Sequence, residues 1–288
     1  MTTNVDDIVK VLEKACLRAR QTELLTKIFD PDRPRTSFRV ELDSGAVIKV
    51  RWLESEEVAI NHQELRSVLP ESFTPVLARI ENVLIEPWIQ GCPLTETRPT
   101  ELLVRKAGHL LAEMHRIPQA AGRPLPFSAS TLGLRDTTIS RLMKLATAGV
   151  LETPTVQMLR NILETNVPTD VPHGLVHMDF CGENMVITPD GRLFIVDNER
   201  TSIGPLGLDV ARTWYRWGLR DQVWDCFLVG YRTARGQSEV LAHELFWRIA
   251  AVMISADLRF RSGYSQLDVP LKCLRSLAQS GFSCGETD

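Results

Sequence analysis

Three polar residues between positions 171 and 200 have the types and spacing that phosphoryl transfer requires. Asn184 lies five residues after Asp179, and Asp197 lies thirteen residues after Asn184. Phosphoryl transfer from a nucleotide needs a carboxylate that orients the attacking hydroxyl and accepts its proton, and an amide and a second carboxylate that hold magnesium ions. We therefore predict that Asp179 faces the hydroxyl and that Asn184 and Asp197 bind Mg²⁺.

The residues between these positions predict a β-hairpin that brings Asn184 close to Asp197. Apolar, β-prone runs at residues 185–187 and 193–196 flank a Pro-Asp-Gly turn at residues 189–191, whose glycine can adopt positive φ. Asn184 then opens one strand and Asp197 closes its partner. The alternative is a buried hairpin with acids at its exposed ends, which accounts for one acid but not for three polar groups at this spacing.

These segments resemble the kinase-like phosphotransferases of the aminoglycoside phosphotransferase and choline kinase type. HMDFCGEN at residues 177–184 resembles their HGDxxxxN catalytic loop, and IVDNER at residues 195–200 resembles their IDWE metal-binding strand. PLGLDVAR at residues 205–212 resembles the segment that follows. Met178 replaces the usual small residue, and Asn198 replaces the usual aromatic residue after the metal-binding acid.

The resemblance implies a two-lobed, protein-kinase-like α+β fold. A smaller β-sheet lobe at residues 1–89 would bind the nucleotide, and a larger, mostly helical lobe at residues 90–288 would carry catalysis and acceptor binding. The resemblance also gives His177 a buried, bracing role and makes His115 part of the scaffold. Asp209 begins a helix after a glycine-containing turn, so its pattern is that of an N-cap, whereas the resemblance has it brace the catalytic loop.

A predicted hairpin near the N-terminus carries a candidate phosphate ligand. Two β-prone runs at residues 36–41 and 46–52 flank an Asp-Ser-Gly turn, and Lys49 lies in the second run. The resemblance places the phosphate-binding lysine here, where its ammonium would neutralise the α- and β-phosphates; otherwise it is an exposed strand lysine. Glu64, in the next predicted helix, is the expected partner of Lys49.

The loop before this hairpin departs from the kinase pattern because residues 33–37 contain no glycine. Related small-molecule kinases use a serine-bearing loop instead, so Thr36 and Ser37 are candidate phosphate contacts. The linker at residues 86–89 is the expected partner of the adenine edge. Because Pro87 has no N–H group, the candidates are the Glu86 carbonyl and the Ile89 or Trp88 amide.

Helical patterns dominate the rest of the chain, and residues 118–137 are predicted to form a long surface segment. Apart from the helix at residues 56–69, helices are predicted at residues 4–29, 101–117, 138–148, 154–165, 207–219, 221–234, 239–262 and 268–280. The resemblance places the acceptor pocket in residues 118–170 and in the last four helices, which carry Trp214, Tyr215, Trp217, Trp224, Tyr231 and Trp247.

The charges in these helices leave the acceptor class open. The aromatic residues together with Asp221, Asp225 and Asp257 could hold a cationic amine. Arg259 and Arg261 could equally bind an anionic acceptor. Ordinary helical packing is the interpretation that we favour for the aromatic residues.

Composition narrows the class of protein. The chain has 288 residues, of which 44% are hydrophobic, and its net charge is −3 with no long basic run, so neither nucleic acid nor membrane is an expected partner. Six scattered cysteines form no CxxC pair, which favours reduced thiols and a cytoplasmic location. The N-terminus has acids and no long apolar run, so it does not have the pattern of a signal peptide.

Taken together, the sequence predicts an enzyme that uses ATP and Mg²⁺ to phosphorylate a hydroxyl of a small molecule. GTP remains an alternative nucleotide, and the sequence does not predict an oligomeric state. The acceptor can be an aminoglycoside or other antibiotic, a choline-like amine, an amino-acid alcohol or a sugar. The glycine-free loop keeps a catalytically degenerate, nucleotide-binding or interaction protein as the alternative. A protein kinase is disfavoured because Gly204 follows only seven positions after Asp197, which leaves little room for an activation loop.

Overall fold

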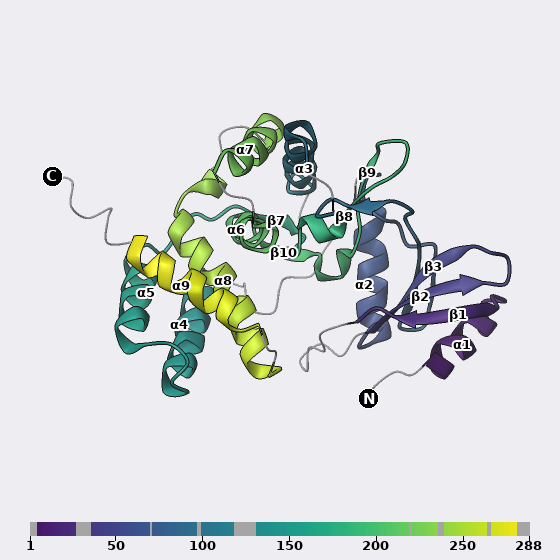
Figure 1. The fold of residues 1–288 in the computed structure, drawn as a ribbon, viewed down its shortest axis with the longest axis horizontal. Helices are drawn as coiled ribbons and strands as arrows, with labels where there is room; N and C mark the ends of the chain where they lie inside the picture. The colour runs from purple at the N-terminus through teal and green to yellow at the C-terminus, as the bar shows by residue number, and fades with distance from the viewer. Residues whose placement is uncertain are drawn as a thin grey trace. The chain divides into compact units, whose positions relative to one another are not determined.

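The computed structural model describes residues 5–26, 36–69, 71–96, 99–117, 131–218, 221–235, 239–263 and 266–280. The chain forms two compact units, one built from residues 1–98 and 183–199, the other from residues 99–182 and 200–288. The first contains an antiparallel sheet and the second is mostly helical, so the predicted α+β architecture is confirmed (Figure 1). The functional division into residues 1–89 and 90–288 stays a prediction.

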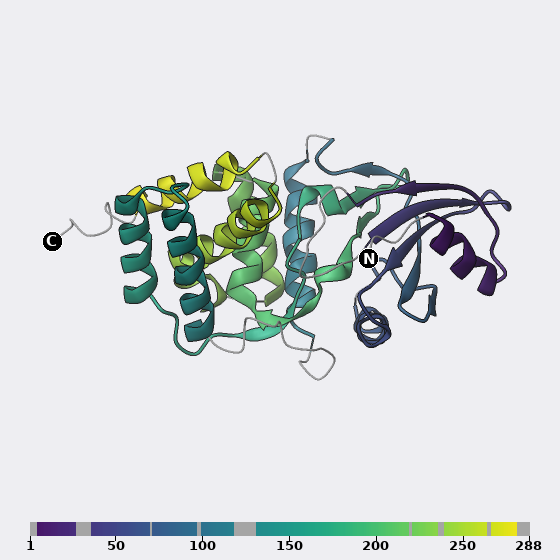
Figure 2. The ribbon, with the colours of Figure 1, turned by 90° about the horizontal axis from the view of Figure 1, so that it is seen from below.

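The first unit is built on a five-stranded antiparallel sheet with the strand order β1-β2-β3-β5-β4. Figure 2 shows these strands beside the helices α1 and α2. The elements are α1 (Val5–Lys14), β1 (Ala19–Leu24), β2 (Thr36–Leu42), β3 (Val47–Trp52), α2 (Glu56–Ser67), β4 (Ala78–Ile80) and β5 (Val83–Pro87). The paired runs around the Asp-Ser-Gly turn and the helix after them are therefore confirmed.

The helix predicted at residues 4–29 is wrong beyond its first half. α1 ends after Lys14, because Cys16 takes a left-handed conformation with φ of 56°. The Leu17 N–H then bonds to the Leu12 carbonyl at 2.9 Å and the Cys16 N–H to the Glu13 carbonyl at 2.9 Å. This is the hydrogen-bond pattern of a Schellman motif, which usually contains glycine at the left-handed position. Because cysteine occupies the position where glycine is usual, the sequence does not indicate that the helix ends here.

The alternation of side chains along β3 separates the core from the charged face of the sheet. Ile48 and Val50 are buried in a cluster with residues of α1. Lys49 and Arg51, at the intervening positions, therefore face the opposite side of the sheet. On that side Leu84 of β5 packs with Ala59 of α2.

A small three-stranded sheet completes the first unit and confirms the predicted hairpin. Its strands are β6 (Cys92–Pro93), β8 (Met185–Ile187) and β9 (Leu193–Ile195), in the order β6-β8-β9. A short 3₁₀ helix, η2 (Gly182–Asn184), leads into β8. The Val196 N–H donates to the Asn184 carbonyl at 2.9 Å. The main chain thus brings the start of β8 and the end of β9 together, as the turn predicted.

The second unit consists of helices around a two-stranded sheet. The strands are β7 (His173–Val176) and β10 (Ser202–Pro205), of which β10 was not predicted. The helices are α3 (Glu101–Met114), α4 (Thr131–Thr147), α5 (Thr153–Thr165), α6 (Leu206–Trp217), α7 (Asp221–Arg235), α8 (Glu244–Arg261) and α9 (Asp268–Ser280). α5 packs against both α4 and α9 (Figure 2).

Glycines allow α3 and α7 to lie in close contact (Figure 1). A Cβ atom at Gly108 would lie 2.1 Å from the Phe227 carbonyl oxygen, and one at Gly230 would lie 2.0 Å from that of Arg105. Both distances are too short for a side chain. The pair α3·α7 therefore requires glycine at each position.

Two predicted segments differ from the structure. The helix at residues 239–262 is split into a 3₁₀ turn, η4 (Glu239–Leu241), and α8, because His243 has a left-handed φ of 56°. α4 begins at Thr131, inside the predicted surface segment, whose residues 118–130 lie outside the described residues. In the parts of the chain that the structure describes, no helix has the length and apolar character to cross a membrane.

Candidate functional site

The first unit brings Lys49 and Asp197 together. The Lys49 Nζ lies 2.6 Å from Asp197 Oδ1, and both side chains are partly exposed. Asp197 follows β9 with a left-handed φ of 63°, a conformation that costs energy for a residue with a side chain. Because Lys49 is on β3 and Asp197 is on the β8–β9 hairpin, this ion pair fixes the hairpin against the charged face of the sheet.

Arg51 is a second cation on the same carboxylate oxygen. Its Nη2 lies 3.0 Å from Asp197 Oδ1 and 3.1 Å from Glu86 Oε2, and its side chain is fully buried. Arg66 of α2 binds the other oxygen of Glu86 at 2.8 Å. Lys49, Arg51, Arg66, Glu86 and Asp197 thus form one continuous network with three cations and two anions. Its surplus positive charge suits a phosphate group.

The charges in this network keep both acids ionised. Burial alone would raise the pKa of Glu86, but the Arg51 and Arg66 guanidinium groups lower it to about 2. Burial also opposes ionisation of Asp197, and the Lys49 and Arg51 charges hold its pKa well below its ordinary value. Burial, together with the Arg51 charge, lowers the pKa of Lys49.

Asn184 and Asp197 fit a magnesium site. Lys49 and Arg51 both use Asp197 Oδ1, so Oδ2 has no partner among the described residues. Among these residues no three His, Cys, Asp or Glu side chains gather as a metal cage. Mg²⁺ is usually held by one or two protein oxygens together with waters and substrate phosphates. An amide oxygen and an ionised carboxylate at the two ends of the β8–β9 hairpin match that requirement.

The structure does not bring Glu64 to Lys49. The buried residues of α2 include Ala59, His62 and Arg66, and Glu64 lies on the exposed side of this helix. Lys49 is paired with Asp197 instead, and α2 contributes Arg66 to the network. A role for Glu64 in nucleotide binding stays a prediction.

The other predicted nucleotide contacts lie on β2 and at the end of β5. Ser37 is a buried residue opposite Arg51 in the β2–β3 register, and its N–H donates to Thr26 Oγ1 at 2.8 Å. Residues 33–35 of the predicted loop lie outside the described residues. The Trp88 N–H donates to the Val47 carbonyl at 3.3 Å. Of the two candidate amides for adenine, this leaves Ile89, which is partly exposed.

In the second unit, Asp209 holds the catalytic loop from behind. Its buried carboxylate accepts hydrogen bonds from the His177 and Met178 N–H groups, both at 2.7 Å. His115 Nε2 lies 3.0 Å from the same carboxylate, while His115 Nδ1 lies 2.7 Å from the Tyr231 hydroxyl. Asp209 is therefore not an N-cap; it braces the loop, as the resemblance implied. Pro205 occupies the cap position of α6.

The tautomer of His115 follows from its partners. A carboxylate only accepts, so His115 Nε2 donates to Asp209 and Nδ1 accepts from Tyr231. Burial lowers the pKa of His115, which favours this neutral form. His115 thus connects α3 and α7 to the catalytic loop, which confirms it as scaffold.

Met178 shows why family members have a small residue at its position. Its φ is 64°, a left-handed conformation that glycine adopts without strain. The Asp209 carboxylate binds its N–H, and Arg212 Nε donates to its carbonyl at 3.2 Å. These bonds hold the strained backbone in place. His177 is fully buried, and its Nδ1 accepts from the Asp179 N–H at 3.3 Å, in agreement with the predicted structural role.

Asp179 lies beside arginine side chains. Arg216 Nε is 2.8 Å from Asp179 Oδ1, and Arg212 Nη2 is 3.7 Å from the same atom. Burial alone would raise the pKa of Asp179, but the charges of Arg216, Arg200 and Arg212 lower it. Asp179 is therefore a carboxylate at neutral pH, the form that can orient a hydroxyl and accept its proton.

Several aromatic residues of the second unit are used in packing. Trp224 stacks on Phe227 at 5.0 Å between ring centroids, and Tyr231 is bonded to His115. Trp247 packs against Gly207, where a Cβ atom would lie 2.5 Å from the indole nitrogen. This outcome agrees with the packing interpretation for these three residues.

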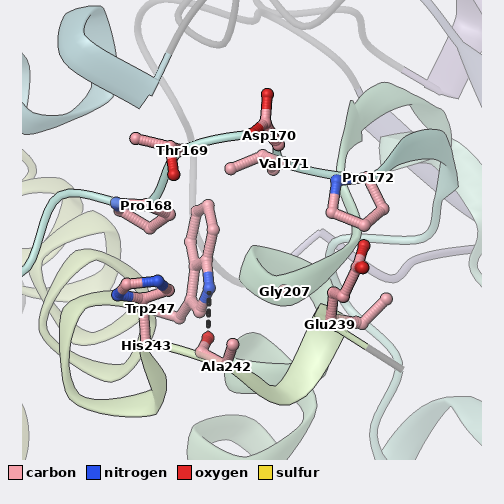
Figure 3. A pocket seen from close by; sticks show the side chains of 11 residues that line it. Pro168, Thr169, Asp170, Val171, Pro172, Gly207, Glu239, Ala242, His243 and Trp247 are labelled. Atoms are coloured by element: carbon pink, nitrogen blue, oxygen red, sulfur yellow. Dashed lines mark hydrogen bonds between the residues drawn. The ribbon is translucent and has the colours of Figure 1, made fainter. Parts of the chain in front are cut away.

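A cavity of about 230 Å³ adjoins Trp247. Figure 3 shows the indole ring extending from α8 toward the segment at residues 168–172, with its Nε1 bonded to the Ala242 carbonyl at 3.0 Å. Asp170, Glu239 and His243 also contribute to the lining. Asp179, Asn184 and Asp197, the residues predicted to carry out phosphoryl transfer, do not line this cavity, so we assign it no part in that step.

Sequence reasoning missed the arginines that contact Asp197, Glu86 and Asp179. Arg51 could have been found, because it shares the face of β3 with Lys49 and lies in an otherwise apolar run. Arg212 and Arg216 are four residues apart and so share one face of α6. No local signal identifies Arg66, since its partner Glu86 is twenty residues away in the sequence.

Comparisons with known proteins agree with this geometry. A sequence model described as the phosphotransferase enzyme family matches residues 51–245, which include Asp179, Asn184 and Asp197. The fold and the site define a kinase-like phosphotransferase. The chain belongs to the phosphotransferase enzyme family, and the predicted resemblance is confirmed. A comparison with curated proteins found no match.

Solved structures with similar folds include three small-molecule kinases. A macrolide 2'-phosphotransferase from Brachybacterium faecium is 14% identical, with 99% of this chain and 100% of that chain covered and a TM-score of 0.64. A choline kinase from Cryptosporidium parvum is 11% identical, with 97% and 96% covered and a TM-score of 0.65. A spectinomycin phosphotransferase, in complex with ADP and spectinomycin, is 12% identical, with 98% and 99% covered and a TM-score of 0.65.

We expect Glu86→Gln to destabilise the protein strongly, because it removes the anion between two buried arginines. Loss of one partner of a buried ion pair costs about 3–5 kcal/mol. The control is Glu56→Gln, which breaks an exposed pair with Arg79 and should cost at most about 1 kcal/mol. Denaturant unfolding at neutral pH measures both, and equal losses for the two variants would contradict the assigned role.

The free energy of unfolding at acidic pH should depend on Glu86. The pKa of Glu86 is lowered from 4.5 to about 2, which corresponds to about 3 kcal/mol at neutral pH. A depressed pKa stabilises the fold above the unfolded value, so this contribution is present above pH 4.5 and is lost as the pH falls toward 2. Denaturant unfolding across this range should show a weaker pH dependence in Glu86→Gln; an unchanged dependence would argue against the ion pair.

Asp209→Asn should weaken the brace behind the catalytic loop. One oxygen that accepts a backbone N–H becomes an amide nitrogen, which cannot accept. Hydrogen bonds to charged groups contribute about 1.5–3 kcal/mol each, so we expect a loss of about 2–4 kcal/mol in the free energy of unfolding. The exposed Asp225 on α7 provides the control Asp225→Asn, expected to change stability by less than about 0.5 kcal/mol. A neutral Asp209→Asn variant would rule out the brace.

Proposed function

We propose that the protein transfers the γ-phosphoryl group of ATP, with Mg²⁺, to a hydroxyl group of a small molecule. The observation that carries this proposal is the contact between Lys49 Nζ and Asp197 Oδ1, 2.6 Å apart, at the end of the hairpin that begins after Asn184. In the proposal Lys49 is the phosphate-binding cation and Asp197 the metal-binding carboxylate, and their contact supports these roles. The family assignment supports phosphoryl transfer as the reaction class.

In this proposal the first unit binds the nucleotide. Lys49 contacts the α- and β-phosphates, and Asn184 and Asp197 hold Mg²⁺, whose charge offsets that of the phosphates. The linker at residues 86–89 contacts adenine, with Ile89 as the amide donor. The ADP in the complex of the spectinomycin phosphotransferase favours ATP over GTP as the nucleotide. Use of ATP accords with the predicted cytoplasmic location.

Asp179 orients the acceptor hydroxyl and takes up its proton. An ionised carboxylate is needed for this, and the neighbouring arginines keep Asp179 in that form. The catalytic loop is held rigid by Asp209, which fixes the direction of the Asp179 side chain. Positioning of this kind supplies most of the rate enhancement in phosphoryl transfer, because the protein takes little part in covalent chemistry.

A small acceptor fits the chain better than a protein substrate. β10 begins five residues after Asp197, and it pairs with β7 along its whole length. α6 follows immediately. This leaves no length of chain for the activation loop that positions a peptide in protein kinases.

Asp179→Asn tests the proposed base. Loss of general-base positioning typically lowers turnover about 10²- to 10⁴-fold. We expect that decrease in kcat for phosphate transfer from [γ-³²P]ATP to hydroxyl compounds, with the Kd for Mg²⁺–ATP changed by less than about threefold. Glu56→Gln, at the exposed pair with Arg79, serves as the control, with unchanged kcat. Turnover within a factor of two of the unsubstituted protein would show that Asp179 is not the base.

A further inference from the structure

The acceptor side of Asp179 carries an unusual concentration of positive charge. Arg212 and Arg216 lie at its carboxylate. The charge of Arg200 also acts on this carboxylate. We call these three residues the arginine cluster. We propose that the acceptor hydroxyl compound carries an anionic group, a carboxylate or a phosphate, that binds to this cluster. The inference rests on the proposed function and names its substrate class.

The cluster is built from neighbouring elements of the second unit. Arg212 and Arg216 are four residues apart on α6 and therefore share one face of that helix. Arg216 Nε lies 2.8 Å and Arg212 Nη2 lies 3.7 Å from Asp179 Oδ1. The charge of Arg200, at the end of the 3₁₀ helix η3 (Asn198–Arg200), also acts on this carboxylate.

The arginines differ in how much they are committed to structure. Arg212 is almost fully buried and donates to the Met178 carbonyl at 3.2 Å and to Ser255 Oγ at 2.8 Å. About 25% of the Arg216 side chain and 17% of the Asp179 side chain are exposed. A ligand in solution can therefore reach both the carboxylate and the Arg216 guanidinium. Arg216 is the member of the cluster that is best placed to contact an acceptor.

Two acids of the described residues near the cluster have other partners. Asp209, on the same helix, is occupied by His115 and by the loop amides. Asp257 of α8 lies 3.2 Å from Arg141 and 3.1 Å from Arg261, so its one negative charge is already paired with two arginines. Asp209 and Asp257 are thus engaged by other groups, whereas Asp179 contacts Arg212 and Arg216.

A further donor extends this region. Tyr215 precedes Arg216 on α6 and lies within electrostatic range of Arg259, Arg212 and Arg216. Burial raises the pKa of Tyr215, so its hydroxyl is neutral and can donate a hydrogen bond. Two or more guanidinium groups with an added O–H donor form an arrangement that recognises carboxylates and phosphates.

The charge pattern limits what the rest of the acceptor can be. Its hydroxyl has to meet Asp179, so its neighbouring atoms have to lie among the arginines. An anionic substituent there gains charge-assisted hydrogen bonds, whereas an ammonium group meets like charges. The aromatic residues that could have favoured a cationic amine include Trp224 and Tyr231, which are used in packing and in the His115 contact.

Compounds that share one carbon skeleton provide the test. Glycerate, glycerol 3-phosphate, glycerol and 3-amino-1,2-propanediol share a 1,2-diol and carry at the third carbon a carboxylate, a phosphate ester, an alcohol or an ammonium group. Gluconate, sorbitol and glucamine repeat the comparison on a longer chain. Phosphate transfer from [γ-³²P]ATP is measured for each compound, and Mg²⁺–ATP binding is measured separately by calorimetry. We expect the anionic members to have kcat/KM values at least about tenfold above those of the neutral and cationic members. Glycerate against glycerol 3-phosphate distinguishes a carboxylate from a phosphate.

Arg216→Gln separates acceptor binding from other roles of the cluster. Loss of a charge-assisted contact should raise the KM for the anionic acceptor about 10- to 100-fold, with little change in the KM for a neutral one. Any effect through Asp179 would instead change kcat for every acceptor alike. The matched control is Arg160→Gln, which removes a surface arginine paired with Glu164 on α5 and should change neither constant.

The outcomes are distinct. Faster transfer to neutral or cationic compounds, or no transfer to any anionic compound by a protein that binds Mg²⁺–ATP, would overturn the anionic acceptor and leave the proposed function standing. An equal loss of kcat for all acceptors in Arg216→Gln would mean that the cluster acts on the transferring phosphoryl group. That result would also overturn the anionic acceptor. A protein that does not bind Mg²⁺–ATP would contradict the proposed function. In that case calorimetric binding of glycerate or gluconate that is weakened in Arg216→Gln would still support the anion site. If neither compound binds, the anion site is refuted.

Discussion

One carboxylate oxygen holds the charge network of the first unit together. Asp197 Oδ1 accepts from Lys49 at 2.6 Å and from Arg51 at 3.0 Å. Arg51 in turn contacts Glu86, which is fixed by Arg66 of α2. The sheet, the helix and the β8–β9 hairpin are therefore linked by a chain of alternating charges. Since buried charges are stable only when they are paired, the position of each group is determined by the others.

A second carboxylate has the corresponding task in the helical unit. Asp209 binds two consecutive backbone N–H groups of the catalytic loop and, through His115, connects that loop to α3 and α7. The loop contains the strained residue Met178 and presents Asp179. Each unit thus uses a buried or partly buried acid to fix a segment with left-handed backbone next to a functional group. The strain at these positions is balanced by hydrogen bonds and ion pairs around them.

The sequence allowed the α+β fold and the β8–β9 hairpin to be predicted, because the hairpin follows local rules of turns and spacing. The roles of Asp179, Asn184 and Asp197 stay predictions. The limits of such prediction appear where partners are distant in sequence. Lys49 was expected to pair with Glu64 on the nearest helix, yet the structure pairs it with Asp197, 148 residues away. The early end of α1 was missed because Cys16 takes a conformation that glycine usually provides.

The most direct test of this account is the magnesium dependence of nucleotide binding, measured by thermal unfolding with ATP and GTP, with and without Mg²⁺. A ligand that binds only the folded state stabilises it by about 2.7 kcal/mol at a concentration of 100 Kd, which raises the melting temperature by several degrees. The expected result is a shift with ATP that requires Mg²⁺ and is lost in Asp197→Ala. No shift with either nucleotide at millimolar concentration, or a full shift in Asp197→Ala, would contradict the assignment of Asp197 as the metal-binding group.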